Sequence, residues 1–417
     1  MKLILLSFIL VLTLNPAYAQ RSAIADQRAA KFVGYFNAGQ ADSLYTLMGD
    51  AVKLQVPLAT LSSAVQQLKN ALGNLTTSEY FATQQGTSAY IATFQHPGPV
   101  LYINFDKNNK VVSFYTQADK REAAGSVTVK TASAILKGTL SLPQVNRPVP
   151  VVLLIAGSGP TDRDGNSQLL NGKSNYFLQI SDALKLKNIA VFRYDKRAVG
   201  LSTSIKPVAD IVFDDMVDDA VALVKMLKHD KRFSKVIVAG HSEGSMIGML
   251  AAEREKADAF ISLSGPGAPA DVLLKTQIKA GAPAADYERA VLIIDSIKAG
   301  HFTKQKMDGA FNSLFNPALQ PYLYSWMKYD PRQAISKLTM PVLIVQGTND
   351  IQVSVNDAKA LKKADPSAQL KLLLGMSHIL KQGPADGIEN AATYTQPDLP
   401  LHPDLIPTLT AFIDGLK

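Results

Sequence analysis

The sequence predicts an α/β protein with a mostly parallel sheet that helices cover on both faces, preceded by a small α+β domain. The main observation is a series of short, fully apolar runs that alternate with helical segments after about residue 125. Such runs are typical of parallel strands, because a strand buried on both faces has no polar side. The second observation is a different residue pattern before residue 116, where amphipathic helical segments precede β-rich runs.

The first 19 residues have the pattern of a secretory signal peptide. One Lys precedes an apolar stretch from Leu3 to Leu12, and Ala17-Tyr18-Ala19 forms an A-x-A cleavage pattern. We expect the mature protein to begin at Gln20 and to be periplasmic or extracellular. The alternative is a retained membrane anchor, but the apolar stretch is shorter than the ~20 residues that a span needs. We therefore expect no integral membrane segment after cleavage.

The composition excludes several classes of function. The chain has no Cys, so it has neither disulfides nor a Cys-ligated metal. Its net charge of +8 comes from scattered Lys and Arg without a long basic run, which indicates a solvated surface and no nucleic-acid partner. The six histidines are too dispersed for a ligand pair. We expect no metal and no cofactor, and the sequence does not determine the oligomeric state.

Residues 20–116 are predicted to form the small α+β domain. Apolar periodicity predicts helices at 23–39 and 60–73, and β-rich runs predict strands at 88–95, 100–106 and 110–117. The last two strands are joined across Lys107-Asn108-Asn109, which is typical of a hairpin. His96 lies beside Pro97-Gly98 in a predicted turn, and no acid, base and nucleophile cluster here. The polar stretch 117–125 is the predicted linker.

Residues 126–417 are predicted to form the α/β domain. The predicted strands are 133–143, 149–157, 188–195, 235–240, 259–265, 341–347 and 369–375. A mainly helical stretch at about 265–330 interrupts their alternation with single helices. We interpret it as a lid over the site, with a plain extension of the helical layer as the alternative. In open α/β sheets the chemistry lies at the carboxyl ends of the strands.

One strand end carries a candidate nucleophile. Gly240-His241-Ser242-Glu243-Gly244 is a G-x-S-x-G sequence between an apolar strand and a run of small and apolar residues. This context is required by a nucleophile elbow, in which a sharp turn lifts the serine out of the sheet and leaves no room for neighbouring Cβ atoms. Ser242 is therefore the predicted nucleophile.

A serine hydroxyl needs a base, and the base needs an orienting acid. Asp350 follows the apolar strand 341–347 directly, whereas Asp357 lies deeper in the next predicted helix. His378 follows the last predicted strand, whereas His402 lies in a Pro-rich C-terminal stretch. Since these groups follow Ser242 in the order acid, then histidine, we predict Asp350 and His378 as its partners.

The oxyanion of an acyl-transfer intermediate needs two backbone N–H donors. One is expected from Glu243, the residue after the nucleophile. The other is expected from the loop that follows strand 149–157, where Ser158 is the first choice and Gly159 the second, because Pro160 has no N–H. Charged residues at 162–164 either brace this loop by ion pairing or form a solvated turn.

From about residue 122 the chain resembles the α/β-hydrolase superfamily, in particular its esterases and serine-aminopeptidase-like members. The resemblance lies in the G-S-G-P-x-D-R-D-G loop at 157–165, in "YDKRAVGLS" at 194–202 and in the lead-in to the acid at 329–353. Ala198 stands where the second segment usually has Gly. The N-terminal region resembles small domains of unassigned function that precede such hydrolases. The resemblance implies the same triad of Ser242, Asp350 and His378.

Together these features predict a serine hydrolase, specifically a carboxylesterase that cleaves small to medium acyl esters through an acyl-enzyme. Its partner is then a small-molecule ester. One alternative is a peptidase of the serine-aminopeptidase kind, which needs an acidic group in the lid for the substrate amine, and 265–280 offers only Asp271. The other alternative is a non-catalytic binding protein on the same fold.

Overall fold

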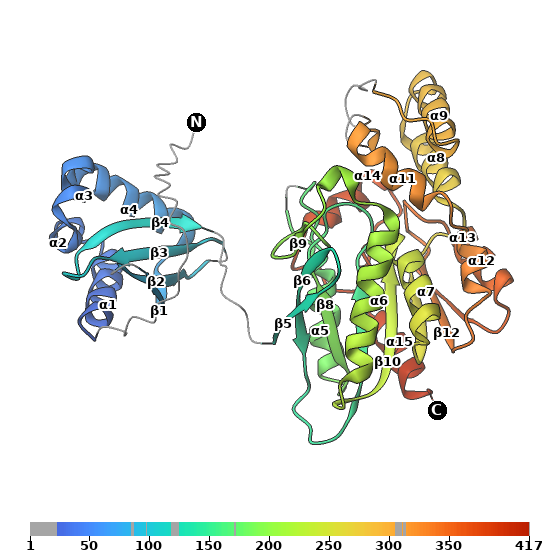
Figure 1. Cartoon of the computed structure of the whole chain (residues 1–417), viewed down its shortest axis with the longest axis horizontal. Helices are drawn as coiled ribbons and strands as arrows, with labels where there is room; N and C mark the ends of the chain where they lie inside the picture. Colours follow the sequence, from blue (N-terminus) through green and yellow to red (C-terminus); the bar gives the residue numbers. More distant parts are fainter. Residues whose placement is uncertain are drawn as a thin grey trace. The chain divides into compact units, whose positions relative to one another are not determined.

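The computed structural model describes residues 23–84, 87–96, 98–117, 125–170, 172–304, 311 and 314–416. The chain divides into two compact units, Met1–Arg121 and Glu122–Lys417 (Figure 1). The predicted signal peptide and most of the predicted linker lie outside the described residues. No helix in the described ranges is both long and apolar enough to cross a membrane.

The N-terminal unit is a helical layer on one antiparallel sheet. Its helices are α1 (Ala23–Ala38), α2 (Ala41–Leu47), α3 (Asp50–Gln55) and α4 (Leu58–Leu72). Its strands, in spatial order, are β1 (Leu75–Gln84), β2 (Thr87–Phe94), β3 (Val100–Phe105) and β4 (Val111–Gln117). The predicted helices and the predicted hairpin are present as α1, α4 and β3–β4. Helices α2 and α3 and strand β1 were not predicted from the sequence.

The core of this unit forms where the helices meet the sheet. Phe32 and Phe36 of α1 and Leu61 of α4 are almost fully buried against inward-facing residues of β3 such as Leu101 and Ile103. These side chains recur at helical spacing in α1 and at alternate positions in β3, as a single packed interface requires. The unit therefore has a core of its own.

The C-terminal unit is built on one large sheet. Its spatial order is β13 (Gln369–Leu373), β12 (Val342–Gly347), β11 (Ala259–Leu263), β10 (Phe233–His241), β7 (Val149–Ile155), β8 (Ala190–Tyr194), β6 (Ala134–Ser141) and β5 (Ser126–Lys130), with β9 (Thr203–Ser204) on β6. The strands from β13 to β8 are parallel to their neighbours, and β5, β6 and β9 pair antiparallel. Every predicted strand is present, and β5 and β9 are additional.

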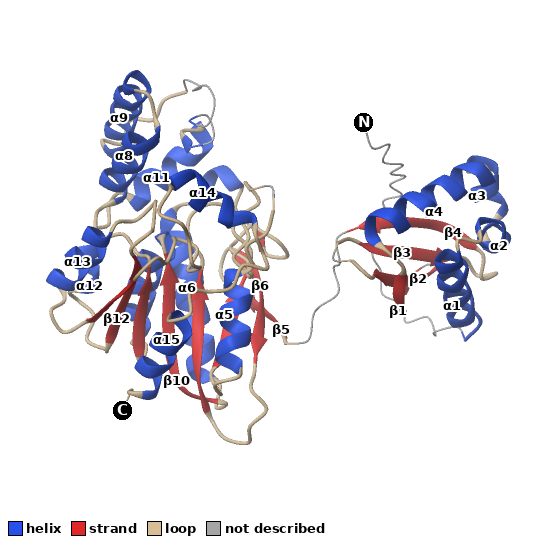
Figure 2. Cartoon of the chain, turned by 180° about the vertical axis from the view of Figure 1, so that it is seen from behind, coloured by secondary structure: helices blue, strands red, loops and turns tan. Residues whose placement is uncertain are grey.

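Helices cover both faces of this sheet. One face carries α5 (Tyr176–Lys185) and α15 (Leu405–Asp414), and the other carries α6 (Phe213–His229), α7 (Glu243–Glu255), α12 (Pro331–Ile335) and α13 (Val355–Ala364) (Figures 1 and 2). In β7, Val151 and Leu153 face the α6–α7 core while Val152 and Leu154 face the α5–α15 core. The strand is therefore apolar throughout because both of its faces are buried.

The predicted insertion between β11 and β12 is helical. It contains α8 (Ala270–Gly281), α9 (Ala284–Lys298), η2 (Pro317–Leu319) and α11 (Gln320–Trp326). These helices lie at the end of the sheet where the parallel strands terminate (Figure 2). The remaining short elements are η1 (Val208–Asp210), α14 (Gly387–Ala392) and η3 (Thr393–Thr395).

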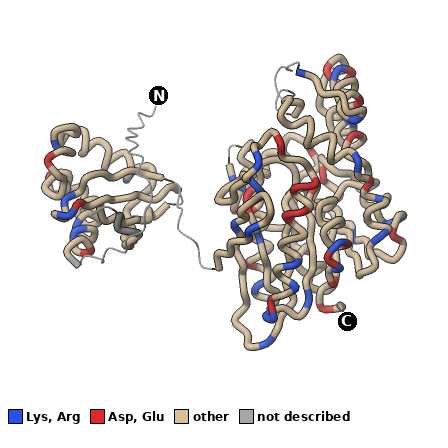
Figure 3. The backbone as a smooth tube through the Cα atoms, in the orientation of Figure 1, with Lys and Arg blue, Asp and Glu red and all other residues tan. Residues whose placement is uncertain are grey.

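The predicted fold class is confirmed: a mostly parallel sheet with helices on both faces, and a separate α+β domain before it. Figure 3 shows Lys and Arg interspersed with Asp and Glu along the backbone of both units. This distribution is typical of a solvated surface.

Candidate active site

Ser242 lies at a sharp turn between β10 and α7. Its φ of 55° and ψ of −125° fall in a region that non-glycine residues rarely adopt, so the surrounding structure must hold it there. A Cβ atom added at Gly240 would clash with the backbone oxygen of Gly244, and one added at Gly244 would clash with that of Ile155. Both glycines are therefore required by the close packing of this turn.

His378 and Asp350 form a buried pair. His378 Nδ1 lies 2.8 Å from Asp350 Oδ2, which also accepts a hydrogen bond from Gln346 Nε2 at 3.0 Å. The other oxygen, Oδ1, accepts from the backbone N–H groups of Gln352 and Val353 at 2.8 and 2.9 Å. Burial acts to raise the pKa of Asp350, but His378 and these hydrogen bonds outweigh it and hold the pKa below its usual value. The carboxylate therefore stays ionised.

His241 joins the elbow to His378. Its Nε2 lies 2.7 Å from the backbone carbonyl oxygen of His378, and its Nδ1 lies 3.1 Å from the hydroxyl of Tyr176. Burial, followed by the neighbouring His378, lowers the pKa of His241 to about 3, so its ring is neutral near pH 7. Because a carbonyl oxygen can only accept, Nε2 carries the proton and Nδ1 accepts from Tyr176.

Ser242 is half-buried beside this arrangement, and its Oγ makes no hydrogen bond within the described part of the chain. His378 is nevertheless held next to the elbow, because the rings of His241 and His378 lie 4.7 Å apart.

Asp357 and His402, the alternatives to Asp350 and His378, have other roles. Asp357 completes the capping box of α13 with Ser354 and accepts a hydrogen bond from the backbone N–H of Gly267. His402 is buried, where its Nε2 lies 3.0 Å from the carbonyl oxygen of Leu374. Neither residue therefore pairs with His378 or Ser242 in the described structure.

The two predicted oxyanion donors belong to segments next to Ser242. A Cβ atom added at Gly157 would lie 3.0 Å from the Cβ of Ser242, so the loop after β7 packs directly against the elbow. Ser158 is the next residue of that loop and is exposed. Glu243 occupies the first position of α7, where a backbone N–H has no acceptor within its own helix.

Ion pairs brace the loop at 157–165. Arg163 pairs with Asp195 at 2.6 Å, and its backbone N–H also donates to that carboxylate at 2.9 Å. Asp164 pairs with Arg193 of β8. Asp162 instead accepts backbone N–H bonds within the loop itself. The ion-pairing interpretation is therefore correct for Arg163 and Asp164.

A buried polar cluster beside the elbow was not predicted. Lys196 lies after β8, and its Nζ is 3.1 Å from Glu243 Oε1 and 2.9 Å from the carbonyl oxygen of Gly157. The hydroxyl of Tyr322, in α11, donates to the same Glu243 oxygen at 2.8 Å. The sequence signals for Lys196 were its place just beyond a parallel strand and within the 194–202 segment, and neither indicated its partners. Among the described residues, no group of three or more His, Asp or Glu side chains is arranged to hold a metal ion.

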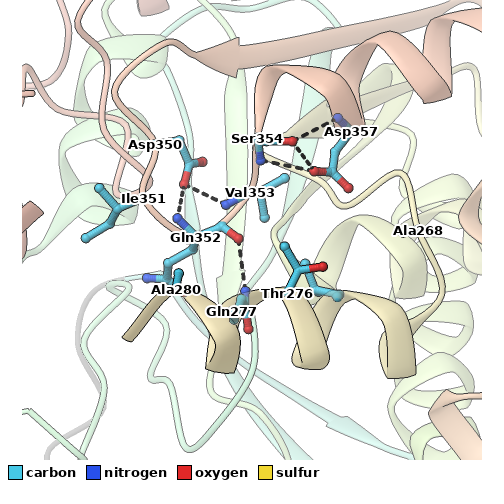
Figure 4. Close-up of a pocket in the computed structure, with 11 residues that line it drawn as sticks. Ala268, Thr276, Gln277, Ala280, Asp350, Ile351, Gln352, Val353, Ser354 and Asp357 are labelled. Atoms are coloured by element: carbon cyan, nitrogen blue, oxygen red, sulfur yellow. Dashed lines mark hydrogen bonds between the residues drawn. The ribbon is translucent and has the colours of Figure 1, made fainter. Parts of the chain in front are cut away.

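A pocket of about 140 Å³ lies between α8 and the loop that carries Asp350 (Figure 4). Gln277 of α8 donates from Nε2 to the backbone carbonyl oxygen of Gln352 at 3.1 Å across it. The pocket is lined by α8 and by the loop that carries Asp350, here called the acid loop. Ser242 is not part of its lining. The pocket therefore marks a contact between the helical insertion and the acid loop.

Comparisons with known proteins give a separate match in each of the two units. Residues 170–282 match the family model described as serine aminopeptidase, S33, and residues 29–114 match the one described as protein of unknown function (DUF3887). The curated protein Esterase EstD from Thermotoga maritima is 27% identical over 381 residues, which cover 86% of this chain and 88% of that protein.

Two solved structures are also similar to part of this chain. Est1E from Butyrivibrio proteoclasticus with bound ferulic acid is 18% identical with a TM-score of 0.44, covering 69% of this chain and 96% of that one. Proline iminopeptidase from Mycobacterium smegmatis is 16% identical with a TM-score of 0.46, covering 69% and 97% of the two chains.

Proposed function

We propose that this protein, whose C-terminal unit is an esterase-like α/β-hydrolase domain, is a carboxylesterase that cleaves small to medium acyl esters with Ser242 as its nucleophile. The observation that carries the proposal is the 2.8 Å pair of His378 and Asp350 beside an elbow that holds Ser242 at a φ of 55°. A buried carboxylate–imidazole pair next to a strained serine is the arrangement that activates a hydroxyl for acyl transfer.

The proton path follows from the hydrogen bonds. Because Asp350 is an ionised acceptor, it keeps the proton of a neutral His378 on Nδ1 and leaves Nε2 free to act as a base. As Ser242 Oγ attacks the ester carbonyl carbon, Nε2 takes the hydroxyl proton. It then gives that proton to the departing alcohol, and the acyl group stays on Oγ.

Hydrolysis of the acyl-enzyme repeats the sequence with water. Nε2 of His378 removes a proton from the water, whose oxygen attacks the acyl carbonyl carbon, and the proton then returns to Ser242 Oγ as the acid leaves. Both steps pass through a tetrahedral oxyanion, for which the backbone N–H groups of Ser158 and Glu243 are the proposed donors. The helices at 270–326 are proposed to form the lid over the acyl group.

A peptidase is the second candidate, favoured by the match to the serine aminopeptidase model. Such an enzyme needs a carboxylate free to bind the substrate's amine. Asp271 is buried and ion-paired with Lys298 at 2.6 Å, and the Glu243 side chain is occupied by Lys196. These pairings favour the esterase. A screen of p-nitrophenyl esters of increasing chain length, beside aminoacyl-p-nitroanilides, distinguishes the two activities.

The test of the nucleophile is Ser242→Ala. We expect it to abolish ester hydrolysis, with a loss on the order of 10⁶ in kcat as for other triad serines, and to prevent labelling by a fluorophosphonate probe. Ser245→Ala is the matched control, because Ser245 lies one turn further along α7 and bonds to Ser262 at 2.8 Å. Labelling of the Ser242→Ala protein would identify another nucleophile, and an unlabelled wild-type protein would favour the non-catalytic binding protein.

We also propose that the enzyme works outside the cytoplasm, because residues 1–19 have the pattern of a cleaved secretory signal. Expression of the full-length gene product, followed by intact-mass measurement of the exported protein, tests this directly. The expected mass is that of a chain beginning at Gln20. Recovery of the full-length mass in the membrane fraction would instead identify an anchor.

A further inference from the structure

The buried cluster around Lys196 contacts the proposed oxyanion loop through its backbone. Lys196 Nζ donates to the carbonyl oxygen of Gly157 at 2.9 Å and pairs with Glu243 Oε1 at 3.1 Å. Both side chains are at most 5% exposed. A buried ammonium and carboxylate lose much of their hydration, and such a pair is often no more stabilising than apolar residues of the same size. Its presence beside the elbow therefore invites an explanation in terms of function.

The hydrogen bond from the Lys196 ammonium to the carbonyl oxygen of Gly157 fixes the orientation of the Gly157–Ser158 peptide. In a planar trans peptide the carbonyl group of one residue and the N–H of the next point in opposite directions. Fixing the carbonyl of Gly157 toward Lys196 therefore turns the N–H of Ser158 away from it. Since Gly157 packs against the Cβ of Ser242, that N–H is held on the loop next to the nucleophile.

We propose that Lys196 is a positioning residue of the oxyanion hole: its ammonium, held by the carboxylate of Glu243, fixes the Gly157–Ser158 peptide so that the Ser158 N–H faces the developing oxyanion. This inference rests on the proposed esterase function. Glu243 then contributes twice, with its backbone N–H as the second donor and with its side chain as the anchor of Lys196.

The helical insertion also contacts the Lys196–Glu243 pair. Tyr322 of α11 donates its hydroxyl hydrogen to the Glu243 oxygen that Lys196 also contacts. Burial, and then the nearby carboxylate, raise the pKa of Tyr322 far above its usual value, so the hydroxyl remains a donor at every working pH. The orientation of the oxyanion donor is thereby linked to the seating of α11 on the site.

The central test is Lys196→Met, which keeps the length of the side chain and removes the hydrogen bond. We expect kcat for p-nitrophenyl esters to fall by about 10- to 100-fold, less than or equal to the loss of a whole oxyanion donor, while KM changes by less than about threefold. Affinity for a trifluoromethyl ketone should fall by the same factor as kcat/KM, because its tetrahedral hemiketal with Ser242 Oγ places an oxyanion in the hole.

Two further variants keep the test decisive. Lys196→Met leaves Glu243 buried without its counter-ion, so the double variant with Glu243→Gln removes both charges and guards against a simple failure to fold. It should fold and show the same loss of kcat. Tyr322→Phe should lower kcat by several-fold in the parent but not further in the double variant, because both act through one carboxylate.

Lys206→Met is the control for breaking a lysine–carboxylate pair elsewhere, since Lys206 pairs with Asp215 at 2.7 Å. It should leave kcat unchanged. If Ser242→Ala is inactive and the folded Lys196 variants retain kcat within about threefold of the parent, the positioning role is overturned while the esterase proposal stands. If Ser242→Ala retains activity, the esterase mechanism itself fails, whatever the Lys196 variants do.

Discussion

His241 Nε2 lies 2.7 Å from the backbone carbonyl oxygen of His378, so the residue before the proposed nucleophile holds the backbone of the proposed base. The bond joins the β10–α7 turn to the loop after β13, two segments that are 137 residues apart in the chain. Its partner atoms require a neutral imidazole with the proton on Nε2. The site therefore depends on a histidine that does not titrate near neutral pH.

The buried His241 makes the free energy of unfolding depend on pH. The pKa of His241 is about 3 in the folded protein and about 6.5 in the unfolded chain. Between pH 3 and 6.5 His241 is therefore protonated only in the unfolded chain. Stability contributed by this group is thus present above pH 6.5 and is lost as the pH falls toward 3, at about 1.4 kcal/mol per pH unit. His241→Gln should flatten the slope of unfolding free energy between pH 4 and 6.5 by about that amount, measured by urea unfolding. Equal slopes in the two proteins would contradict the assignment.

The acid of the proposed triad is tested by two matched substitutions. Asp350→Asn should lower kcat by about 10⁴, because an amide no longer holds His378 in the tautomer that accepts a proton. Asp357→Asn removes one acceptor oxygen from the capping box of α13 instead, so it should cost about 0.5–1.5 kcal/mol of stability, as for one hydrogen bond, and leave kcat unchanged. Steady-state kinetics on p-nitrophenyl acetate decide between them, and an exchange of the two phenotypes would identify Asp357 as the acid.

Ala198 has a φ of 60°, in the left-handed region where a glycine is unstrained. It is exposed, so removing its methyl group loses no packing. Ala198→Gly should therefore raise the unfolding free energy by up to about 1 kcal/mol, the left-handed strain outweighing the added entropy of the unfolded chain. The matched change Ala209→Gly, at an exposed alanine without positive φ, should lower stability by roughly 0.5–1 kcal/mol. The same sign for both changes in chemical denaturation would refute the strain argument.

The N-terminal unit is predicted to support access, association or stability and not bond cleavage. Its core is separate, and the contacts described around Ser242, Asp350 and His378 come from residues of the C-terminal unit. A fragment beginning at Glu122 should therefore fold, as judged by circular dichroism, and hydrolyse p-nitrophenyl acetate with kcat close to that of the full chain. A folded fragment without turnover would show that the N-terminal unit completes the site.

The central strands could be predicted because burial on both faces leaves mainly apolar residues in them. β7, β10, β11 and β12 all have this signature. β1 was missed because Thr, Ser and Glu fill much of "LTTSEYFATQ", and α2 and α3 are too short for helical periodicity to emerge. Periodicity thus identifies elements that are long and apolar enough to show it, and it misses short or polar ones even when they contribute to the core.

The residues of the candidate site were likewise predictable only in part. Ser242, Asp350 and His378 were selected because each follows a predicted strand, and the structure brings the last two within hydrogen-bonding distance. Their catalytic roles stay predictions. Lys196 and Tyr322 could not be linked from sequence, because no periodicity shows which side chains from a loop and a distant helix meet around one carboxylate.

The parallel pairing of β7 with β10, in which Ile155 lies opposite Gly240, also governs when the site can form during folding. Parallel neighbours cannot be joined by a tight turn, so the ends of a long crossover must meet before Gly157 reaches Ser242. His378 arrives across an even longer stretch of chain. Helices such as α6 and α7 form from local contacts, so helical signal returns early, whereas such long-range contacts come slowly. Recovery of catalysis after dilution from denaturant therefore reports the last stage of refolding.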